Sequence, residues 1–322
     1  MMNTTIFKRN IRQIMLCCLL IPAILLGGCS TPVNQEKNST TNEQPEAKTS
    51  VTQSPTEDTS GQENTPKQDT SDQENSSGTD GFDFNQTLTL KTPEPAAGEM
   101  PRILFVGNSH TFTNNLPDLF SELAAAMNHP CDVQELTEGY YTLTQFADPA
   151  DEMGAVLNQK LTEETWDFVI LQENTNDSVT SAEETMLPAA KTLDEKIRAA
   201  GGQTGLLMTW SPKEGAGILS LDDVQTILSQ NLINVSKELD SLLVPGGIAF
   251  MRCLEQYPQI ELWGEDGMHP SLEGSYLAAC TAYAVIFQES PEGCTYTAGL
   301  DSETAAHLQT LAAGFLTAPT AS

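Results

Sequence analysis

The sequence is poor in basic residues. Among its 322 residues, 15 are lysine or arginine and 44 are aspartate or glutamate, which gives a formal net charge of −29 at pH 7. Most of the negative charge falls in residues 99 to 322. A surface of this sign repels nucleic acid and anionic lipid headgroups, so we expect neither as a partner. Neutral substrates such as glycans or small esters fit the charge better.

Histidine is scarce as well, and the cysteines lack the spacing of a metal site. The chain has four histidines and seven cysteines, and no two cysteines form a CxxC pair. Structural zinc sites usually draw on closely spaced Cys and His pairs, so we expect no metal. Four cysteines lie beyond residue 99 and allow three disulfide pairings, among which the sequence does not choose: Cys131, Cys253, Cys280 and Cys294.

The apolar run near the N-terminus is too short to span a bilayer comfortably. Ile14 to Leu26 follows three basic residues and ends in Gly-Gly-Cys29, which is the pattern of a signal peptide. The Leu-Gly-Gly-Cys ending resembles the bacterial lipobox, in which the cysteine is lipidated. We therefore expect residues 1–28 to be a lipoprotein signal peptide and Cys29 to anchor an exported protein to the outer face of the bacterial cell membrane. A plain cleavable signal with an incidental cysteine is the alternative.

Residues 29–98 lack the aliphatic clusters that a core needs. Ser, Thr, Gln, Asn, Glu, Asp and Pro dominate this stretch, so it cannot bury enough apolar surface to offset chain entropy. We expect a disordered linker, with Phe82 and Phe84 near its end as candidates to pack on the folded part. The remaining residues, 99–322, have the length of one α/β domain and contain no internal repeat.

Strand-like and helix-like segments alternate through residues 99–322. This alternation is typical of a parallel sheet covered on both sides by helices, a three-layer α/β/α fold. The predicted strands are Ile103–Val106, Cys131–Leu136, Phe168–Leu171, Gly205–Thr209 and Ile248–Met251. The predicted helices are Leu116–Met127, Pro149–Leu161, Ser181–Ala200, Leu221–Leu242, Ser271–Gln288 and Ser302–Phe315.

Ser109 stands at the break between the first predicted strand and the helix that follows, after Gly107 and Asn108. Ligands of open α/β sheets bind at the carboxyl ends of the strands. A serine on a tight turn there exposes its hydroxyl and lies near helix amides that can stabilise an oxyanion. Gly-Asn-Ser also occurs in ordinary turns, so the nucleophile hypothesis needs a partner histidine.

His269 has the surroundings of a catalytic base. Asp266 precedes it by three residues, at the entry to the last long helix. A catalytic histidine needs a partner on Nδ1 that fixes its tautomer and stabilises the imidazolium, and an aspartate in the same tight turn can supply it. The alternative is that the pair only organises a helix start. Of the other three histidines, we expect His129 and His307 to be structural or surface residues. We expect His110 to support the site without taking part in catalysis.

Together the two segments resemble the SGNH hydrolases, also called GDSL-like esterases. Gly-Asn-Ser-His-Thr follows the first strand, and Asp-Gly-Met-His-Pro precedes the last large helix, with the resemblance covering residues 102 to 288. It implies a flavodoxin-like fold with a five-stranded parallel sheet. It also implies Ser109 as the nucleophile, His269 as the general base and then acid, and Asp266 as the orienting carboxylate.

The same resemblance implies an oxyanion hole with three donors. These are the N–H of Ser109, the N–H of a glycine matched by Gly139, and a side-chain amide after the third strand. The third motif departs from the family's Gly-x-Asn-Asp, because the chain reads Gln172-Glu173-Asn174 there. Gln172 and Asn174 are both candidates, and we slightly prefer Gln172.

The implied reaction is acyl transfer from an ester to serine and then to water, without a metal or organic cofactor. We expect a serine esterase that removes small acyl groups, in particular acetyl groups, from carbohydrate. A lipase or lysophospholipase, an acyltransferase of the same fold, and an inactive glycan-binding surface lipoprotein are the alternatives. Asn108, Tyr140 and Trp210 are candidate substrate contacts, with core packing as the alternative for Trp210.

Overall fold

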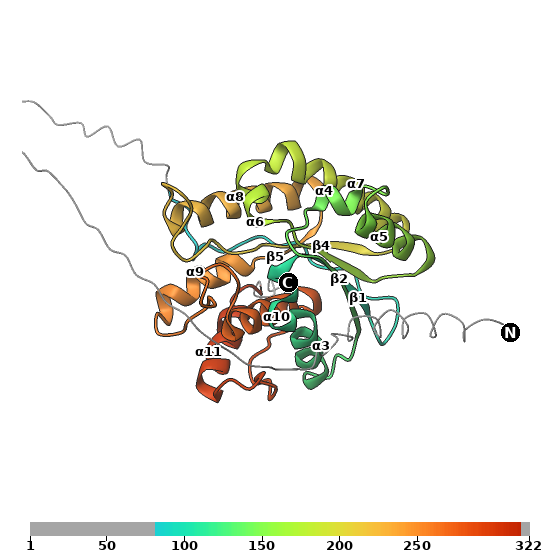
Figure 1. The fold of residues 1–322 in the computed structure, drawn as a ribbon. Coiled ribbons are helices and arrows are strands. Elements are labelled where there is room, and N and C mark those ends of the chain that lie inside the picture. Colours follow the sequence, from blue (N-terminus) through green and yellow to red (C-terminus); the bar gives the residue numbers. More distant parts are fainter. Residues whose placement is uncertain (1–80, 317–322) are drawn as a thin grey trace, which may run out of the picture. The chain divides into compact units, whose positions relative to one another are not determined.

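The computed structural model describes residues 81–316. The expected signal peptide, Cys29 and most of the expected linker lie outside these residues. Five strands form one parallel sheet in the order β2-β1-β3-β4-β5 (Figure 1). They are β1 (Arg102–Gly107), β2 (Asp132–Thr137), β3 (Phe168–Leu171), β4 (Gln203–Leu207) and β5 (Leu242–Val244). The predicted five-stranded parallel sheet is confirmed.

Helices cover both faces of the sheet, so the fold has three layers. In Figure 1, α4 to α8 lie on one side, and α3, α9, α10 and α11 lie on the other. None of the helices in residues 81–316 is long and apolar enough to cross a membrane. Their bounds are α2 (Ser109–Phe112), α3 (Leu116–Ala126), α4 (Leu143–Ala147), α5 (Glu152–Glu163), α6 (Thr175–Thr180), α7 (Leu187–Ala199), α8 (Leu221–Leu239), α9 (Gly246–Gln256), α10 (Leu272–Phe287) and α11 (Ser302–Ala313).

The core is densest around the central strands and α10. Ile103–Val106 of β1 and Phe168–Leu171 of β3 are almost fully buried, as expected for parallel strands covered on both faces. Helix α10 is buried all round from Gly274 to Ile286, because α3, α9 and α11 pack against it (Figure 1). A helix with no polar face fits only in such a position. The rigid centre of the fold thus carries the strand that precedes Ser109.

The predicted fifth strand, Ile248–Met251, is wrong. Those residues lie inside helix α9, and the true edge strand, Leu242–Val244, comes a few residues earlier. The predicted helix Leu221–Leu242 accordingly ends at Leu239. A short buried apolar run has the same appearance in a strand and in a fully buried helix. Gly246 and Gly247 let α9 approach the end of β4 closely.

Residues 81–98 pack on the domain. The folded part therefore begins earlier in the chain than residue 98, where the expected linker was to end. Phe82 and Phe84 contact the hydrophobic core, as expected, together with Leu88, Leu90 and Ala96. The buried guanidinium of Arg252 on α9 donates to the carbonyl oxygens of Phe84, at 2.8 Å, and Gln86, at 3.0 Å. These contacts attach the segment to the folded part from about residue 82 onward.

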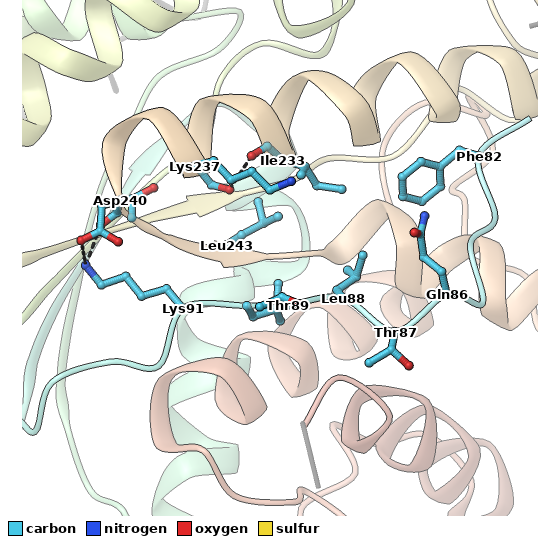
Figure 2. Close-up of a pocket in the computed structure, with 13 residues that line it drawn as sticks. Phe82, Gln86, Thr87, Leu88, Thr89, Lys91, Ile233, Lys237, Asp240 and Leu243 are labelled. Atoms are coloured by element: carbon cyan, nitrogen blue, oxygen red, sulfur yellow. Dashed lines mark hydrogen bonds and ion pairs between the residues drawn. The ribbon is translucent and has the colours of Figure 1, made fainter. Parts of the chain in front are cut away.

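An open groove of about 570 Å³ lies between this segment and the end of α8 (Figure 2). Leu88 and Leu90 form one wall, and Ile233 and Leu243 contribute to the other. The ion pair between Lys91 Nζ and Asp240 Oδ2, at 2.7 Å, closes one end. The residues that line this groove do not belong to the Ser109 turn or to the segment that holds His269.

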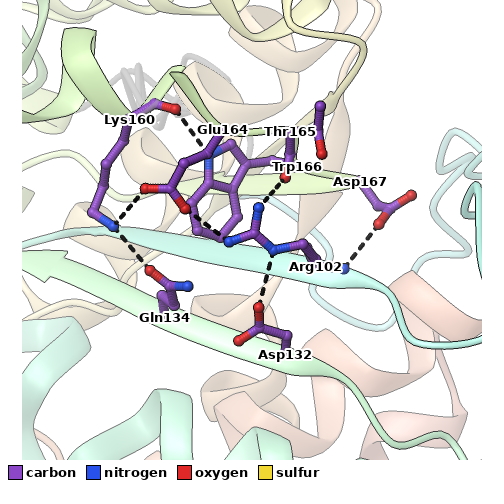
Figure 3. Close-up of polar contacts among 8 residues, drawn as sticks. All are labelled: Arg102, Asp132, Gln134, Lys160, Glu164, Thr165, Trp166 and Asp167. Carbon is purple, nitrogen blue, oxygen red and sulfur yellow. Dashed lines mark hydrogen bonds and ion pairs between the residues drawn. The ribbon is translucent and has the colours of Figure 1, made fainter. Parts of the chain in front are cut away.

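A cluster around Arg102 fastens the amino end of the sheet (Figure 3). The guanidinium donates to Asp132 Oδ2 at 2.9 Å, to Glu164 Oε2 at 2.8 Å and to the carbonyl oxygen of Thr165 at 2.8 Å. It also lies 4.3 Å from the centre of the Trp166 ring. The cluster joins β1 to β2 and to the loop before β3, at the opposite end of β1 from Ser109.

The four cysteines of the described residues are all free thiols, so none of the three disulfide pairings is formed. Cys253, Cys280 and Cys294 are buried, and Cys131 is half-buried. Burial raises the pKa of Cys253 to about 12 and that of Cys131 to about 11. These thiols are therefore protonated near neutral pH and act as small apolar side chains.

Candidate active site

Ser109 is the first residue of α2, directly beyond the end of β1. Asn108 caps the helix, because its Oδ1 accepts from the backbone N–H of His110 at 3.2 Å. The turn requires glycine at position 107, since a Cβ there would lie 2.5 Å from Gln172 Oε1. A residue at a helix start has no intrahelical partner for its N–H. The turn thus presents the hydroxyl and the N–H of Ser109 together.

Gln172 binds Asn108 through both ends of its side-chain amide. Its Oε1 accepts from the N–H of Asn108 at 2.9 Å and from Thr111 Oγ1 at 2.8 Å. Its Nε2 donates to Asn108 Oδ1 at 3.0 Å and to the carbonyl oxygen of Glu173 at 2.7 Å. Both hydrogens of this amide are therefore used, and the slight preference for Gln172 as the oxyanion donor is not supported.

Asn108 is also buried and hydrogen-bonded. Its Nδ2 donates to the carbonyl oxygen of Tyr141 at 2.9 Å, and its side chain is about 1% exposed. It therefore cannot contact a substrate as expected, and it instead ties the nucleophile turn to the loop after β2. The Asn108–Gln172 pair thus holds three neighbouring strand ends together at the position of Ser109.

The structure brings together the three residues of the expected triad. Ser109 Oγ lies 2.7 Å from His269 Nε2, and His269 Nδ1 lies 2.5 Å from Asp266 Oδ2. Ser109 and His269 are 160 residues apart in the chain. The hydroxyl can donate to Nε2 while Nδ1–H donates to the carboxylate, which is the hydrogen-bonding order that a serine nucleophile requires.

Asp266 is held as an anion by the turn that it forms. Its Oδ1 accepts from the backbone N–H of Met268 at 2.9 Å and of His269 at 3.0 Å. The hydrogen bond from the His269 ring, followed by that from Met268, lowers the pKa of Asp266 to about 2. The carboxylate is therefore charged near neutral pH, and it favours the Nδ1–H tautomer of His269.

Three side chains or backbone groups from other elements hold the segment with His269 in place. Trp210 Nε1, beyond β4, donates to the carbonyl oxygen of Met268 at 3.2 Å. The N–H of Lys213 donates to the carbonyl oxygen of Gly267 at 2.8 Å. Asn114 Nδ2, just after α2, donates to the carbonyl oxygen of Pro270 at 3.0 Å. Nothing in the sequence indicated that Asn114 holds this segment.

Trp210 is a packing residue and not a substrate contact. Its side chain is about 1% exposed and stacks in parallel on Phe250, with ring centres 4.2 Å apart. Trp263 is also buried, and its Nε1 donates to the carbonyl oxygen of Ser211 at 3.0 Å. Of the two readings open for Trp210, the structure therefore favours core packing.

His110 lies between the triad histidine and Trp210. Its ring centre is 5.4 Å from that of His269 and 5.5 Å from that of Trp210. Burial, with the nearby His269 as the second cause, lowers the pKa of His110 to about 4. His110 is thus a neutral side chain near pH 7 that packs against His269, consistent with support and not with direct catalysis.

Gly139 lies in the loop after β2, and its N–H donates to Glu138 Oε1 at 2.9 Å. Glu138 is exposed, so its side chain can leave this position when a ligand competes for the N–H. The next residue, Tyr140, has a positive φ of 63° and is 85% exposed. It is the candidate substrate contact that has a free side chain.

Asn174 is the amide that remains available after β3. Its Oδ1 caps α6 by accepting from the N–H of Asn176 at 3.0 Å, and its backbone N–H donates to Glu173 Oε1 at 2.6 Å. No hydrogen bond within residues 81–316 uses its Nδ2. Of the two candidate amides after β3, Asn174 is therefore the one whose side-chain N–H groups are unpaired in the described residues.

The other expectations concern metals and the remaining histidines. No group of three or more His, Cys, Asp or Glu side chains in the described part of the chain is arranged to hold a metal ion. His129 lies 2.7 Å from Glu289 through its Nε2, and His307 stacks on Tyr257 with ring centres 4.0 Å apart. His129 lies in the connection between α3 and β2, and His307 lies on α11.

No family model matches the chain, and no curated protein matches it in sequence. Solved structures do. A protein from Slackia heliotrinireducens described as "a putative SGNH hydrolase" is 28% identical, with a TM-score of 0.52, over 58% of this chain and 98% of its own. The chain has the SGNH hydrolase fold. A DUF4886 family protein from Bacteroides uniformis is 16% identical, with a TM-score of 0.55, over 66% of this chain and 93% of its own.

The SGNH hydrolase fold places Ser109 at the carboxyl end of the central strands, where the sequence resemblance predicted the nucleophile. The similarity to the Slackia protein supports hydrolase activity in general. An acetyl-xylooligosaccharide esterase from a Geobacillus species is also similar, at 16% identity and a TM-score of 0.46, over 59% of this chain and 96% of its own. A likeness of that size does not indicate which bond this SGNH-type chain cleaves.

Proposed function

We propose that this chain is a serine esterase that hydrolyses small acyl esters, in particular acetyl esters of carbohydrate. The observation that carries the proposal is the line of hydrogen bonds from Ser109 Oγ through His269 to Asp266, with distances of 2.7 and 2.5 Å. It lies at the carboxyl edge of a sheet with the SGNH hydrolase fold. A hydroxyl, a base and an orienting carboxylate in this order are the requirements for acyl transfer.

The reaction begins when His269 Nε2 accepts the proton of Ser109 as Oγ attacks the ester carbonyl carbon. Asp266, which is ionised because its pKa is about 2, stabilises the imidazolium that forms. His269 then gives the proton to the leaving alcohol, and an acyl-serine remains. Water, deprotonated by the same histidine, attacks the acyl-serine and releases the acid. The cycle needs no further co-reactant.

Three donors are assigned to the oxyanion in this scheme: the N–H of Ser109, the N–H of Gly139 and Nδ2 of Asn174. They come from the loops after β1, β2 and β3, which are adjacent strands. Glu138 occupies the Gly139 N–H in the free protein and is displaced by the developing oxyanion. Such donors stabilise the charge that appears only in the transition state.

A neutral glycan ester fits the surroundings of the site. The chain has a net charge of −29, which disfavours anionic substrates. Tyr140 exposes an aromatic face next to Gly139, and such a face can pack on the apolar side of a sugar ring. An exported protein held at the outer face of the membrane through Cys29 would meet such substrates, and this location stays a prediction.

Ser109→Ala tests the esterase proposal directly. Without a nucleophile, we expect hydrolysis of p-nitrophenyl acetate to fall by about a thousandfold or more, with the protein still folded. Initial rates at pH 8 with purified protein, together with circular dichroism, provide the measurement. Equal rates for the wild type and Ser109→Ala would reject the proposal and favour an inactive glycan-binding protein.

The substrate class is tested by comparing esters on the wild-type enzyme. We expect release of acetate from acetylated xylan and from p-nitrophenyl acetate, and little hydrolysis of p-nitrophenyl palmitate or lysophospholipid. A preference for the long-chain esters would instead favour a lipase. Adding a free sugar as acceptor separates hydrolysis from acyl transfer, because a transferase would form an acetylated sugar at the expense of acetate.

A further inference from the structure

Within residues 81–316, Glu173 is a buried carboxylate without a cationic partner. Its side chain is about 2% exposed, and the groups that favour its charged form are the backbone N–H groups of Asn174 and Leu143, with no Lys, Arg or His among them. Burying a charge in this way lowers stability. Glu173 directly follows Gln172, which binds the turn before Ser109, and a buried carboxylate in such a position is a candidate for a functional role.

The carboxylate joins two loops on either side of the nucleophile turn. Oε1 and Oε2 accept from the N–H of Leu143 at 3.1 and 3.2 Å, and Oε1 accepts from that of Asn174 at 2.6 Å. Leu143 begins α4 directly after the Gly139 loop, which follows β2, and Asn174 follows β3. Because β1 lies between β2 and β3, the bridge spans the strand that leads to Ser109.

We propose that Glu173 is a positioning residue for the oxyanion site: its carboxylate holds the Gly139 loop and Asn174 at the separation that a tetrahedral intermediate on Ser109 requires. This inference rests on the proposed esterase function. Glu173 touches no reacting atom. It fixes the backbone from which two donors project, and donors that are already in place stabilise an oxyanion better than donors that must rearrange.

The protonation state of Glu173 decides whether the bridge is complete. Burial raises the pKa of Glu173 to about 7, and the charge of Asp177 on α6 adds to the rise, while the N–H groups of Asn174 and Leu143 oppose it. Below this pH one carboxyl oxygen carries a proton and becomes a donor. A proton on Oε1 faces the N–H groups of both Asn174 and Leu143, and a proton on Oε2 removes one of the two acceptors of the Leu143 N–H, so the bridge between the two loops weakens.

The same pKa has the opposite effect on stability. Because the folded-state pKa lies above the ordinary value of 4.5, the folded protein holds this proton more tightly than the unfolded chain. The resulting stabilisation is fully present below pH 4.5 and is lost as the pH rises through about 7. Glu173 therefore lowers stability at the pH at which the bridge is intact, which is expected of a functional and not of a structural carboxylate.

Glu173→Gln tests the positioning role, with Glu164→Gln as the matched control at the amino end of the sheet. At pH 8 with p-nitrophenyl acetate, we expect Glu173→Gln to lower kcat about tenfold or more and to change KM less than about twofold. Its unfolding temperature should stay within about 3 °C of the wild type, since the removed charge was destabilising. Glu164→Gln should lower the unfolding temperature, through the lost bond to Arg102, and leave kcat unchanged.

The proposal is overturned if kcat of Glu173→Gln lies within about twofold of the wild type, or if its loss of kcat matches a loss of folded protein. The pH profile gives a second measurement. Wild-type kcat should fall as the pH is lowered through about 7, because Glu173 takes up a proton there. The acidic limb of the wild-type profile should therefore be steeper than that of Glu173→Gln.

The wild-type profile decides alone if the variant does not fold, because a kcat that does not fall as the pH is lowered through about 7 would then overturn the role of Glu173. Failure of this inference is distinguishable from failure of the esterase proposal. If the esterase proposal fails, the wild type and Ser109→Ala have equal activity. If only the role of Glu173 fails, the enzyme is active and depends on Ser109, but its kcat and the acidic limb of its pH profile do not depend on Glu173.

Discussion

Two amide side chains decide how the nucleophile is presented. Gln172 and Asn108 are 64 residues apart, and each is about 1% exposed. Their hydrogen bonds fix the turn before Ser109 and leave no donor of Gln172 free. Buried amides that are fully paired stabilise one conformation, and removing one partner leaves the others unsatisfied. At the scale of single residues, the site therefore separates residues that hold the turn from residues that can meet a substrate.

Asn174→Ala and Gln172→Ala should have different effects. We expect Asn174→Ala to lower kcat about 10²-fold to 10³-fold, because one oxyanion donor is lost, and to lower the free energy of unfolding by about 1 kcal/mol through the lost cap of α6. Gln172→Ala should lower the free energy of unfolding by about 2–4 kcal/mol, since it leaves buried groups of Asn108 and Thr111 unpaired. Steady-state kinetics and urea unfolding measure the two effects. A stable Gln172→Ala enzyme with a kcat as low as that of Asn174→Ala would restore Gln172 as the donor.

At the scale of elements, the junction between β5 and α9 shows how packing overrides local pattern. Pro245-Gly246-Gly247 followed by an apolar run is typical of a turn and a strand. The structure instead begins α9 at Gly246 and places its first turn against the end of β4. A Cβ on Gly247 would collide with the carbonyl oxygen of Thr209 and with the side-chain amide of Gln225. Glycine is required there for close approach and not for a turn.

Gly247→Ala should therefore be strongly destabilising. The added methyl group forces α9 away from β4, and overpacking of this kind costs about 1–3 kcal/mol or somewhat more. Gly98→Ala is the matched control, because a Cβ at Gly98 meets no atom within 4 Å. Urea unfolding of both variants gives the comparison. If Gly247→Ala unfolds at the same urea concentration as Gly98→Ala, the close contact between α9 and β4 is not present.

At the scale of the whole domain, the segment 81–98 belongs to the fold although its composition resembles a linker. It contributes few apolar side chains, yet Phe82 and Phe84 contact the core and two of its carbonyl groups accept from Arg252. Arg252 is about 7% exposed and has no carboxylate among its hydrogen-bond partners in the described residues. Those carbonyl oxygens are thus what makes its burial tolerable.

A chain that begins at residue 99 should be less stable than one that begins at residue 81. Removing residues 81–98 uncovers apolar core surface and leaves Arg252 without two of its acceptors, so we expect a loss of about 3 kcal/mol or more. Thermal and urea unfolding of the two chains measure the difference. Equal stability would mean that the segment only rests on the surface. Esterase kinetics of the longer chain serve as a check that the active site is intact.

Much of the candidate site could be predicted from the sequence. Asp266 and His269 are three residues apart in one turn, and Ser109 follows a strand directly, so local spacing made them candidates. The resemblance to SGNH hydrolases then implied the role of each, and likewise that of Gly139 after β2. By contrast, hydrogen bonds between residues far apart in the chain decide which of Asn108, Gln172 and Asn174 keeps an unpaired side-chain amide. No local pattern records which amides are already paired.

The sequence by itself determined the α/β class, the parallel sheet and the positions of Ser109, His269 and Asp266, because strand and helix periodicity and short-range spacing are properties of neighbouring residues. Only the tertiary structure decided that Ile248–Met251 is helical, that Trp210 is buried and that Asn174 has the free amide. It also revealed the bridge made by Glu173 between the loops after β2 and β3. These facts depend on which distant residues share a contact, and burial and hydrogen-bond satisfaction are settled only when the chain packs.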